Sequence, residues 1–261
     1  MTLLSIAILA RDEERHIGGT LESARSVADE TVVLLDPRTA DGTAAICRRF
    51  GARIVEEPFV SFSAQRNRAL AACAGAWVLF LDADERLTPE LRAELERFKA
   101  DPPADRAGFW IPRRNTYWGR ALRGGGWYPD HQLRLLRRGA ARYDERRLVH
   151  ELAELDGPDG RLAGHLTHIN IESWGELRAK QRAYALAEAA TLHAGGARFK
   201  PRNLALQPMR EVWRRFVTWR GYRDGALGLL LALVMGWYEL VKYARLRQLS
   251  GAPAPSSRGT P

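Results

Sequence analysis

Residues 77–91, WVLFLDADERLTPEL, contain the pattern that decides the fold. The apolar run 77–81 is typical of a strand that is buried on both faces of a sheet. The run leads directly into Asp82, and two further acids, Asp84 and Glu85, follow it. We therefore expect a buried strand that carries carboxylates to the rim of a sheet.

The same alternation of strands and helices fills the first hundred residues. Strands are predicted at 3–9, 31–35 and 53–55, and helices at 17–24, 43–50, 63–72 and 89–98. Ser63 and Thr88 are the expected N-caps of the last two helices, and Pro89 suits a first helical turn because its missing N–H costs nothing there. This order predicts an α/β fold with a Rossmann-like, mostly parallel sheet flanked by helices on both faces.

Acidic residues follow three of the predicted strands. Glu13 follows the first, Asp36 the second, and Asp82 and Asp84 the fourth. Ligands of such sheets bind beyond the carboxyl ends of the strands. The chain has neither a GxGxxG fingerprint nor a P-loop, so the phosphates of a nucleotide need another partner. An Asp-x-Asp pair can bind Mg²⁺ or Mn²⁺, which completes its shell with water and substrate phosphates. The sequence thus predicts a metal and diphosphate site.

Four segments resemble the inverting glycosyltransferases of family 2, which have the GT-A fold. SIAILARDEERHI matches the family's opening strand and turn, with Asp12 in place of the usual Asn, and VVLLDPRTADGT matches its Asp-Gly-Thr loop, with departures at Pro37, Thr39 and Ala40. FSAQRNRAL matches a helix that carries Arg-Asn, and LFLDADERL matches the metal-site strand. The stretches GWYPDHQLRLLRRG, LVHE and LTHIN, and the C-terminal YRDGALGLLLALVMGWYELVKYARL, resemble the subgroup related to lipopolysaccharide core glucosyltransferases. The resemblance extends to about residue 249 and implies a GT-A domain with a C-terminal helical extension.

The resemblance implies roles for five residues near the donor. Glu13 and Asp36 match positions that contact the nucleotide base or ribose. Arg66 matches a helix residue near the uracil or diphosphate. Asp82 matches the first acid of the motif, near the ribose and metal, and Asp84 matches the second, a direct ligand of Mg²⁺ or Mn²⁺. The departures at residues 12 and 40 concern the recognition of the base.

Inversion at the anomeric carbon also needs a base that takes the proton of the acceptor hydroxyl. Asp130 is the candidate, since it lies downstream of the metal motif and behind the glycines 124–126. Glu151 is the rival base and Glu85 a weaker one. Beside Asp130, Trp127 and Tyr128 are candidates for a sugar platform.

Two histidines and a group of arginines complete the candidate residues. His168 ends an alternating segment, and an imidazole there can complete a metal shell. His150, beside the rival base, is a candidate contact of the acceptor or diphosphate. The arginines 113, 114, 120 and 123 read either as a solvated loop or as a lid that grips an anionic acceptor.

The positive charge is concentrated near the C-terminus. The chain of 261 residues has a net charge of +9, yet residues 1–197 carry equal numbers of basic and acidic side chains, and residues 198–247 carry 11 basic and 3 acidic ones. We expect a catalytic domain at 1–197, a basic, amphipathic helical region at 198–249 and a disordered tail at 250–261. The 14 uncharged residues between Asp224 and Glu239 fall short of the roughly 20 that span a bilayer. The region therefore either packs on the protein or lies on an anionic membrane.

The resulting hypothesis is a metal-dependent inverting hexosyltransferase. Its expected partners are a nucleotide-sugar donor, such as a UDP-hexose, a lipid-linked or cell-envelope glycan acceptor and an anionic membrane surface. The two cysteines, Cys47 and Cys73, favour a reducing compartment, so we expect a cytoplasmic protein on the inner face of the cell membrane. The alternatives are a polyprenyl-phosphate glycosyltransferase and a non-catalytic sugar-nucleotide or membrane-binding module. Nucleic acid is not expected as a partner because the body is neutral and lacks a nucleic-acid-binding motif. The oligomeric state is left open.

Overall fold

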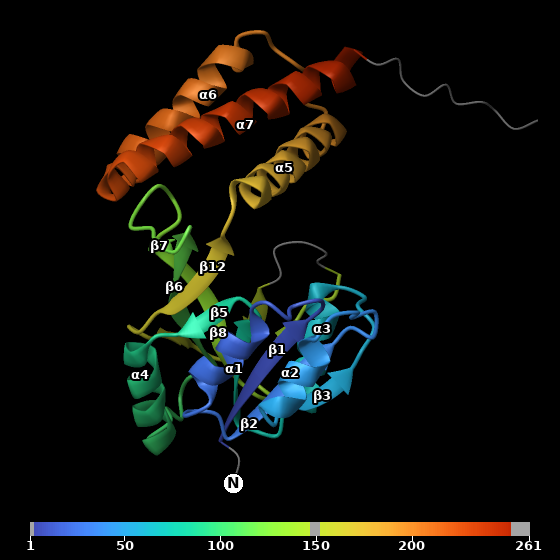
Figure 1. Ribbon diagram of the computed structural model, residues 1–261, viewed down its shortest axis with the longest axis vertical. Coiled ribbons are helices and arrows are strands. Elements are labelled where there is room, and N and C mark those ends of the chain that lie inside the picture. Colours follow the sequence, from blue (N-terminus) through green and yellow to red (C-terminus); the bar gives the residue numbers. More distant parts are fainter. Residues whose placement is uncertain (1–2, 147–151, 252–261) are drawn as a thin grey trace, which may run out of the picture. The chain divides into compact units, whose positions relative to one another are not determined.

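The computed structural model describes residues 3–146 and 152–251 (Figure 1). The chain forms two compact units. The first unit contains Met1–Thr116 and Pro129–Asn170, and the second contains Tyr117–Tyr128 and Ile171–Pro261. The second unit thus begins earlier in the sequence than residue 198, where the charge pattern places the start of the helical region, and it includes an inserted loop.

The first unit begins with the predicted alternation of strands and helices. Its elements are β1 (Leu4–Ala10), α1 (Ile17–Ala24), β2 (Glu30–Leu35), α2 (Thr43–Arg49), β3 (Arg53–Glu56), α3 (Phe62–Ala72), β4 (Trp77–Asp82), β5 (Glu85–Leu87) and α4 (Pro89–Ala100). Thr88 caps α4 by accepting a hydrogen bond from the Leu91 N–H. The expected cap of α3 was wrong by two residues: the Ser61 side chain accepts from the Ala64 N–H, whereas Ser63 is buried inside the helix.

The sheet continues beyond this alternation with antiparallel strands. The later strands are β6 (Gly108–Tyr117), β7 (Arg120–Ala121), β8 (Asp130–Arg137), β9 (Ala141–Tyr143), β10 (Ala153–Leu155), β11 (Asp159–Arg161) and β12 (Leu166–Ile171). The order in the large sheet is β3-β2-β1-β4-β8-β6-β12-β5, and β9 and β10 pair separately. Strands β1 to β4 are parallel, whereas β8 runs antiparallel to both β4 and β6. The α/β prediction is confirmed.

Both faces of the parallel strands are covered by helices. Ile6 and Ile8 of β1 belong to an apolar cluster that includes buried residues of α1, α2 and α4. Ala7, which points to the opposite face, belongs to a second cluster with Ala69 and Leu70 of α3. Successive side chains of a strand alternate between faces, so an uninterrupted apolar run is what a doubly covered strand requires.

The second unit is built on α5 (Trp174–Ala194), α6 (Asn203–Trp213) and α7 (Gly225–Gly251), drawn in yellow to red in Figure 1. A π-helical turn, η1 (Arg214–Thr218), and a 3₁₀ turn, η2 (Gly221–Asp224), connect α6 to α7. Gly236 lets α6 approach α7 closely, because a Cβ there would lie 2.6 Å from Val212 Cγ2. Lys242 Nζ of α7 bonds Glu188 Oε2 of α5 at 2.9 Å.

The glycine loop 124–126 packs within this second unit. Gly125 has φ +68° and donates its N–H to the Trp219 carbonyl at 2.7 Å. Asp224 Oδ2 accepts the Gly124 N–H at 3.0 Å. A side chain on Gly124 would collide with the Arg220 carbonyl. These glycines therefore permit a close approach of the loop backbone to the turn between α6 and α7.

Candidate active site

A cleft of about 300 Å³ lies beyond the carboxyl ends of β1 and β2. Glu13 and Asp36 line it together with Phe59, Phe62 and Gln65. The two phenylalanine rings are 44% and 52% exposed and meet edge to face at 5.0 Å. A cleft with acceptor carboxylates at one side and exposed rings at the other suits a nucleoside. Sequence reasoning missed the two rings, although two aromatic residues beside a polar helix start are a usable signal.

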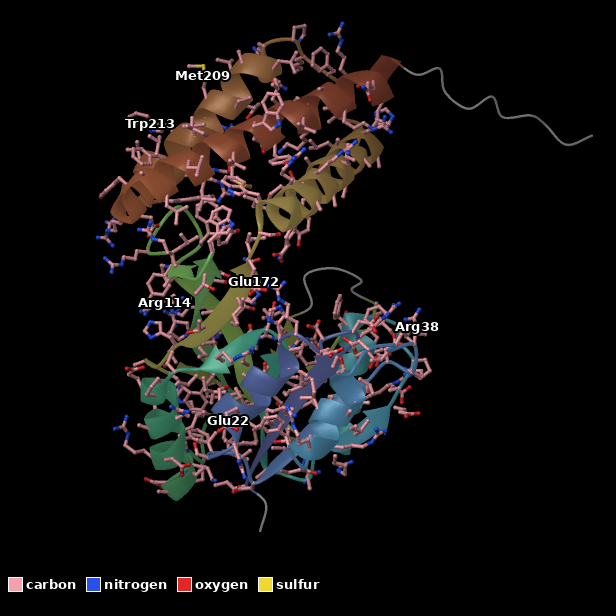
Figure 2. The ribbon with its side chains drawn as sticks, viewed as in Figure 1. Glu22, Arg38, Arg114, Glu172, Met209 and Trp213 are labelled. Atoms are coloured by element: carbon pink, nitrogen blue, oxygen red, sulfur yellow. The ribbon has the colours of Figure 1, made fainter. Side chains whose placement is uncertain are left out.

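Asp36 directly follows β2 and accepts hydrogen bonds from Arg38. The Arg38 backbone N–H and Nε both reach Asp36 Oδ1 at 2.9 Å. These hydrogen bonds hold the pKa of the Asp36 carboxyl well below its usual range. Figure 2 shows Arg38 at the rim of the first unit. Asp36 is therefore an ionised hydrogen-bond acceptor. Its partner Arg38 is more than half exposed, so a ligand can replace Arg38 at the Asp36 carboxylate.

Glu13 lies among several other carboxylates. Burial raises its pKa to about 7, with further contributions from Asp84, Asp41, Asp82 and Asp12. The structure thus brings the acids that follow β1, β2 and β4 to one edge of the sheet. Like charges this close destabilise one another, and a cation relieves the repulsion.

Asp12 occupies a strained position in the turn after β1. Its φ is +53°, in the left-handed region that Asn and Asp tolerate better than other side chains. Its Oδ1 accepts the Ala40 N–H at 2.8 Å and so ties the β1 turn to the loop after β2. The replacement of the family's Asn by Asp therefore preserves both the backbone conformation and an acceptor.

A line of alternating charges begins at the end of β4. Arg134 of β8 bonds both Asp82 Oδ2 and, at 2.9 Å, Glu85 Oε1. Arg113 of β6 donates to the same Glu85 oxygen at 3.1 Å, and its Nη2 lies 2.7 Å from Asp130 Oδ2. Glu85 has no exposed surface and Arg134 is 3% exposed. Buried charges require such pairing. Asp82 and Asp130 are thus the two ends of one ionic network.

Asp82 is held by a further arginine. Arg66 Nη2 of α3 lies 3.5 Å from Asp82 Oδ1. The Arg66 guanidinium also sits over the rings of Phe80 and Tyr143, at 5.3 and 5.7 Å from their centres. Burial opposes ionisation of Asp82, but Arg134 and Arg66 outweigh it and lower the pKa. Arg66 and Asp82 therefore lie side by side at the end of β4.

Asp84 and His168 form a second pair beside this network. His168 of β12 stands opposite Glu85 of β5 in the antiparallel register, which places its ring next to the turn that carries Asp84. Its Nε2 lies 3.1 Å from Asp84 Oδ2. Its Nδ1 lies 2.6 Å from Oδ1 of Asn115, a buried β6 residue that the sequence did not single out.

These two residues fit a divalent cation that takes few ligands from the protein. A carboxylate oxygen and an imidazole nitrogen face the same point, and both suit Mn²⁺. Within residues 3–146 and 152–251, no group of three or more His, Cys, Asp or Glu side chains is arranged to enclose a metal. Mg²⁺ and Mn²⁺ are often held by one or two side chains together with substrate phosphates. Asp84 and His168 are the available ligands.

Asp130 begins β8 in a polar setting. Besides Arg113, it accepts from Gln132 Nε2 at 2.7 Å and from Asn115 Nδ2 at 3.4 Å. Burial alone would raise its pKa, but Arg113 and these donors lower it. Asp130 is thus an ionised carboxylate whose oxygens are oriented by three donors.

Two expectations about neighbouring residues are corrected. Glu85 is wrong as a base because it is fully buried and bridges two arginines. The reading of 113–114 as loop is wrong because both lie in β6, and Arg113 binds Glu85 and Asp130. Arg120 and Arg123 are exposed.

The aromatic pair after the glycine loop belongs to the second unit. Trp127 packs on Tyr117 at 5.8 Å and under the Arg215 guanidinium at 4.6 Å. Its role as a sugar platform stays a prediction, as does that of Tyr128. Glu151 and His150 lie outside the described residues.

Two comparisons with known sequences bear on the family of this chain. The family model described as "Glycosyl transferase family 2" matches residues 5–149. The lipopolysaccharide core biosynthesis glycosyltransferase LpsC of Rhizobium meliloti is 29% identical over 256 residues, 94% of this chain and 92% of that protein.

Two solved structures match this chain at lower similarity. S. aureus TarS 1–349 is 15% identical with a TM-score of 0.47, and the match covers 95% of this chain and 90% of that one. Glucosyl-3-phosphoglycerate synthase from Mycobacterium tuberculosis, in complex with Mn²⁺, UDP-glucose and phosphoglyceric acid, is 21% identical with a TM-score of 0.36. That match covers 43% of this chain and 44% of the synthase.

The family model spans more than half of the chain, and the curated relative aligns along almost all of it. The resemblance seen in the sequence motifs, including that to the lipopolysaccharide core transferases, is therefore confirmed. The mostly parallel sheet flanked by helices, with its C-terminal helices, is the GT-A fold. The chain belongs to glycosyl transferase family 2 and is a glycosyltransferase.

Proposed function

We propose that this glycosyltransferase moves a hexose from a UDP-sugar, with inversion and with the help of Mg²⁺ or Mn²⁺, to a glycan or glycolipid of the cell envelope. One observation carries the proposal. The ionic network of Asp82, Arg134, Glu85, Arg113 and Asp130 connects the end of the donor strand β4 to an ionised carboxylate on the antiparallel half of the sheet. The proposed donor site and the proposed base therefore lie in the same unit.

The donor binds at the carboxyl ends of β1, β2 and β4. The nucleoside occupies the cleft lined by Glu13 and Asp36, with the rings of Phe59 and Phe62 at its side. Arg66, beside Asp82, supplies positive charge for the diphosphate. Asp84 and His168 would hold the cation, which neutralises the charge that develops on the leaving diphosphate.

Asp130 takes the proton of the acceptor hydroxyl as this oxygen attacks the anomeric carbon. Arg113 and Asn115 orient the Asp130 carboxylate and keep it ionised. The proton passes from the acceptor oxygen to Asp130, and the electron pair of the glycosidic bond leaves with the diphosphate. Attack opposite the leaving group inverts the configuration. Glu151 is the alternative base.

The acceptor proposal comes from the named relative. LpsC is a lipopolysaccharide core biosynthesis glycosyltransferase, and similarity along almost the whole chain supports an acceptor of that class. A polyprenyl phosphate is the alternative acceptor.

The experiment is a transfer assay that crosses donors with acceptors. UDP-glucose, UDP-galactose and GDP-mannose are each tested with Mn²⁺ or EDTA, against truncated lipopolysaccharide cores and against undecaprenyl phosphate. Mn²⁺-dependent transfer from a UDP-hexose to a core acceptor supports the proposal. Transfer only to undecaprenyl phosphate would favour the alternative acceptor, and the absence of transfer from either UDP-hexose would contradict the proposed donor.

We further propose that residues 198–249 bind an anionic membrane surface, so that residues 1–197 act as the catalytic domain at the inner face of the cell membrane. An apolar groove of about 790 Å³ runs between α6, η1 and α7. Met209, Trp213 and Trp237 line it and are 68%, 65% and 61% exposed. Figure 2 labels Met209 and Trp213 on α6. Exposed basic residues of the same region are Arg198, Lys200, Arg202, Arg210, Arg220, Arg223, Arg245 and Arg247.

The contacts of α7 favour a helix that lies on the membrane. By length and composition Gly221–Gly251 is long and apolar enough to cross one, with a mean hydropathy of 1.5 and 22% burial over its most apolar window. However, the C-terminal half of α7 packs on the polar helix α5: the Tyr238 hydroxyl donates to the Arg178 carbonyl at 3.2 Å, and Lys242 pairs with Glu188. Such charged groups are costly in a hydrocarbon core, so an interfacial position suits this unit better.

A further inference from the structure

Asn115 lies between the proposed base and the proposed metal ligand. It is 4% exposed in β6, and its amide faces Asp130 on one side and His168 on the other. Its Nδ2 lies 3.4 Å from Asp130 Oδ2, and its Oδ1 lies 2.6 Å from His168 Nδ1. No sequence pattern marks Asn115, because Asn115, Asp130 and His168 lie on three different strands.

The neighbours of Asn115 determine which way its amide points. An ionised carboxylate only accepts hydrogen bonds, so the side of the amide that faces Asp130 must be the NH₂ group. The oxygen then faces His168 and also accepts from Asn170 Nδ2 at 3.2 Å. The reverse orientation would place the amide oxygen against the Asp130 carboxylate, and the NH₂ group against His168 Nδ1 and Asn170 Nδ2.

This orientation fixes the hydrogen on the His168 ring. A carbonyl oxygen at 2.6 Å from Nδ1 requires Nδ1 to carry the hydrogen. In the neutral ring, Nε2 then presents its lone pair towards Asp84 Oδ2, 3.1 Å away. Two acceptor atoms that face each other repel unless a cation lies between them, which is the arrangement that a metal pair needs.

We propose that Asn115 is a positioning residue that holds His168 in the Nδ1–H tautomer and thereby couples the orientation of the Asp130 carboxylate to the cation site of Asp84 and His168. The inference rests on the proposed function, because it needs His168 as a ligand. It adds that one amide serves both the donor-side cation and the acceptor-side base. Loss of this amide should therefore weaken cation binding without removing any ligand.

The test measures cation binding and the tautomer directly, in the full chain without donor. Free Mn²⁺ is followed by electron paramagnetic resonance in the wild type, Asn115→Ala, Asn115→Asp and His168→Ala. The His168 tautomer is read from imidazole ¹⁵N shifts at about pH 9, above the ordinary titration range of histidine. Thermal melting and circular dichroism check that each variant is folded.

The expected results separate a positioning role from a structural one. Asn115→Ala should raise the Mn²⁺ dissociation constant by about 10–100-fold, the usual effect of removing a partner of a metal-bound histidine, and should reduce the Nδ1–H fraction. Asn115→Asp still accepts from Nδ1–H, so it should keep the Mn²⁺ affinity of the wild type. It should nevertheless slow transfer, because it places a negative charge beside Asp130.

Three outcomes would overturn the inference. The wild-type ring could prove to be the Nε2–H tautomer. Asn115→Ala could leave the Mn²⁺ constant within twofold while His168→Ala weakens it. A folded Asn115→Asp variant could lose Mn²⁺ binding, which also decides the matter if Asn115→Ala does not fold. If His168→Ala itself leaves Mn²⁺ binding unchanged, the proposed metal site fails, and the inference fails with it for that separate reason.

Discussion

Arg113 of β6 stands directly opposite Asp130 of β8 in the antiparallel register, and its Nη2 lies 2.7 Å from Asp130 Oδ2. The same guanidinium donates to the fully buried Glu85. Arg113 therefore pairs with two carboxylates. It neutralises Glu85, which has no exposed surface, and it orients Asp130, which is part-buried.

Replacing Arg113 should change both stability and the pH profile. Arg113→Met removes a charged donor from Glu85, which should lower the free energy of unfolding by about 1–3 kcal/mol in a urea titration. Without the guanidinium the pKa of Asp130 should rise, because burial is then less opposed, and the acid limb of the transfer rate should move to higher pH. Arg113→Lys, which keeps the charge, is the control and should shift the limb less. An unmoved limb in Arg113→Met would contradict the assignment of Asp130 as the base.

Asp130→Asn should slow transfer while leaving donor affinity near that of the wild type. The amide cannot take the acceptor proton, so we expect a loss of about 10²–10⁴-fold in kcat, the usual contribution of a positioned base. Donor binding is measured separately by calorimetry with UDP and Mn²⁺. Full activity in Asp130→Asn, with a loss in Glu151→Gln, would move the role of base to Glu151.

Asp84→Ala should abolish activation by Mn²⁺ and leave the fold intact, because Asp84 lies at the rim and is part-exposed. The measurement is the transfer rate across a Mn²⁺ titration together with thermal melting. Asp105→Ala is the matched control, since this acid is 72% exposed and pairs only loosely with Arg106. Wild-type turnover by Asp84→Ala in limiting Mn²⁺ would show that the cation binds elsewhere.

The stability of the metal-free protein should depend on pH through Glu13. Its pKa is raised from 4.5 to about 7 by burial and by the surrounding acids. A carboxyl whose pKa is higher in the folded chain binds more protons when folded, so its contribution makes the free energy of unfolding fall as the pH rises from about 4.5 to about 7. Glu13→Gln should flatten this fall in urea titrations across that range. An equally steep fall in the variant would assign it to other groups.

Binding to vesicles should depend on the groove between α6 and α7. Substituting Met209, Trp213 and Trp237 together by serine should weaken binding to anionic liposomes by at least about tenfold, since burying one large apolar side chain is worth about 1.5–3 kcal/mol. Tyr184→Ser on α5, 54% exposed in the wild type, is the control and should bind normally. High salt should weaken wild-type binding without abolishing it, because only the charge term is screened. Full-length protein that fails to float with anionic or neutral vesicles would contradict the membrane proposal.

The sequence by itself determined the α/β half of the fold and the presence of acids directly after its strands. A period-2 face cannot be seen in WVLFLD, but an uninterrupted apolar run followed by Asp82 and Asp84 requires a doubly covered strand that ends at a polar rim. Local rules also gave the cap Thr88. These features depend on neighbours in the chain, which a sequence displays.

Only the tertiary structure decided how the antiparallel strands complete the site. From the sequence, Arg113 is interpreted as part of a solvated loop or a lid, and Asn115 and Arg134 are given no role, because their partners are 15 to 53 positions away. The pairing of β8 with β4 and β6, and of β12 with β5, brings them to Asp82, Glu85, Asp130 and His168. Register is set by the burial of whole strands and not by any single residue. The sequence could therefore name the acids at the rim, while the buried arginines and the amide that hold them emerged only when the strands were paired.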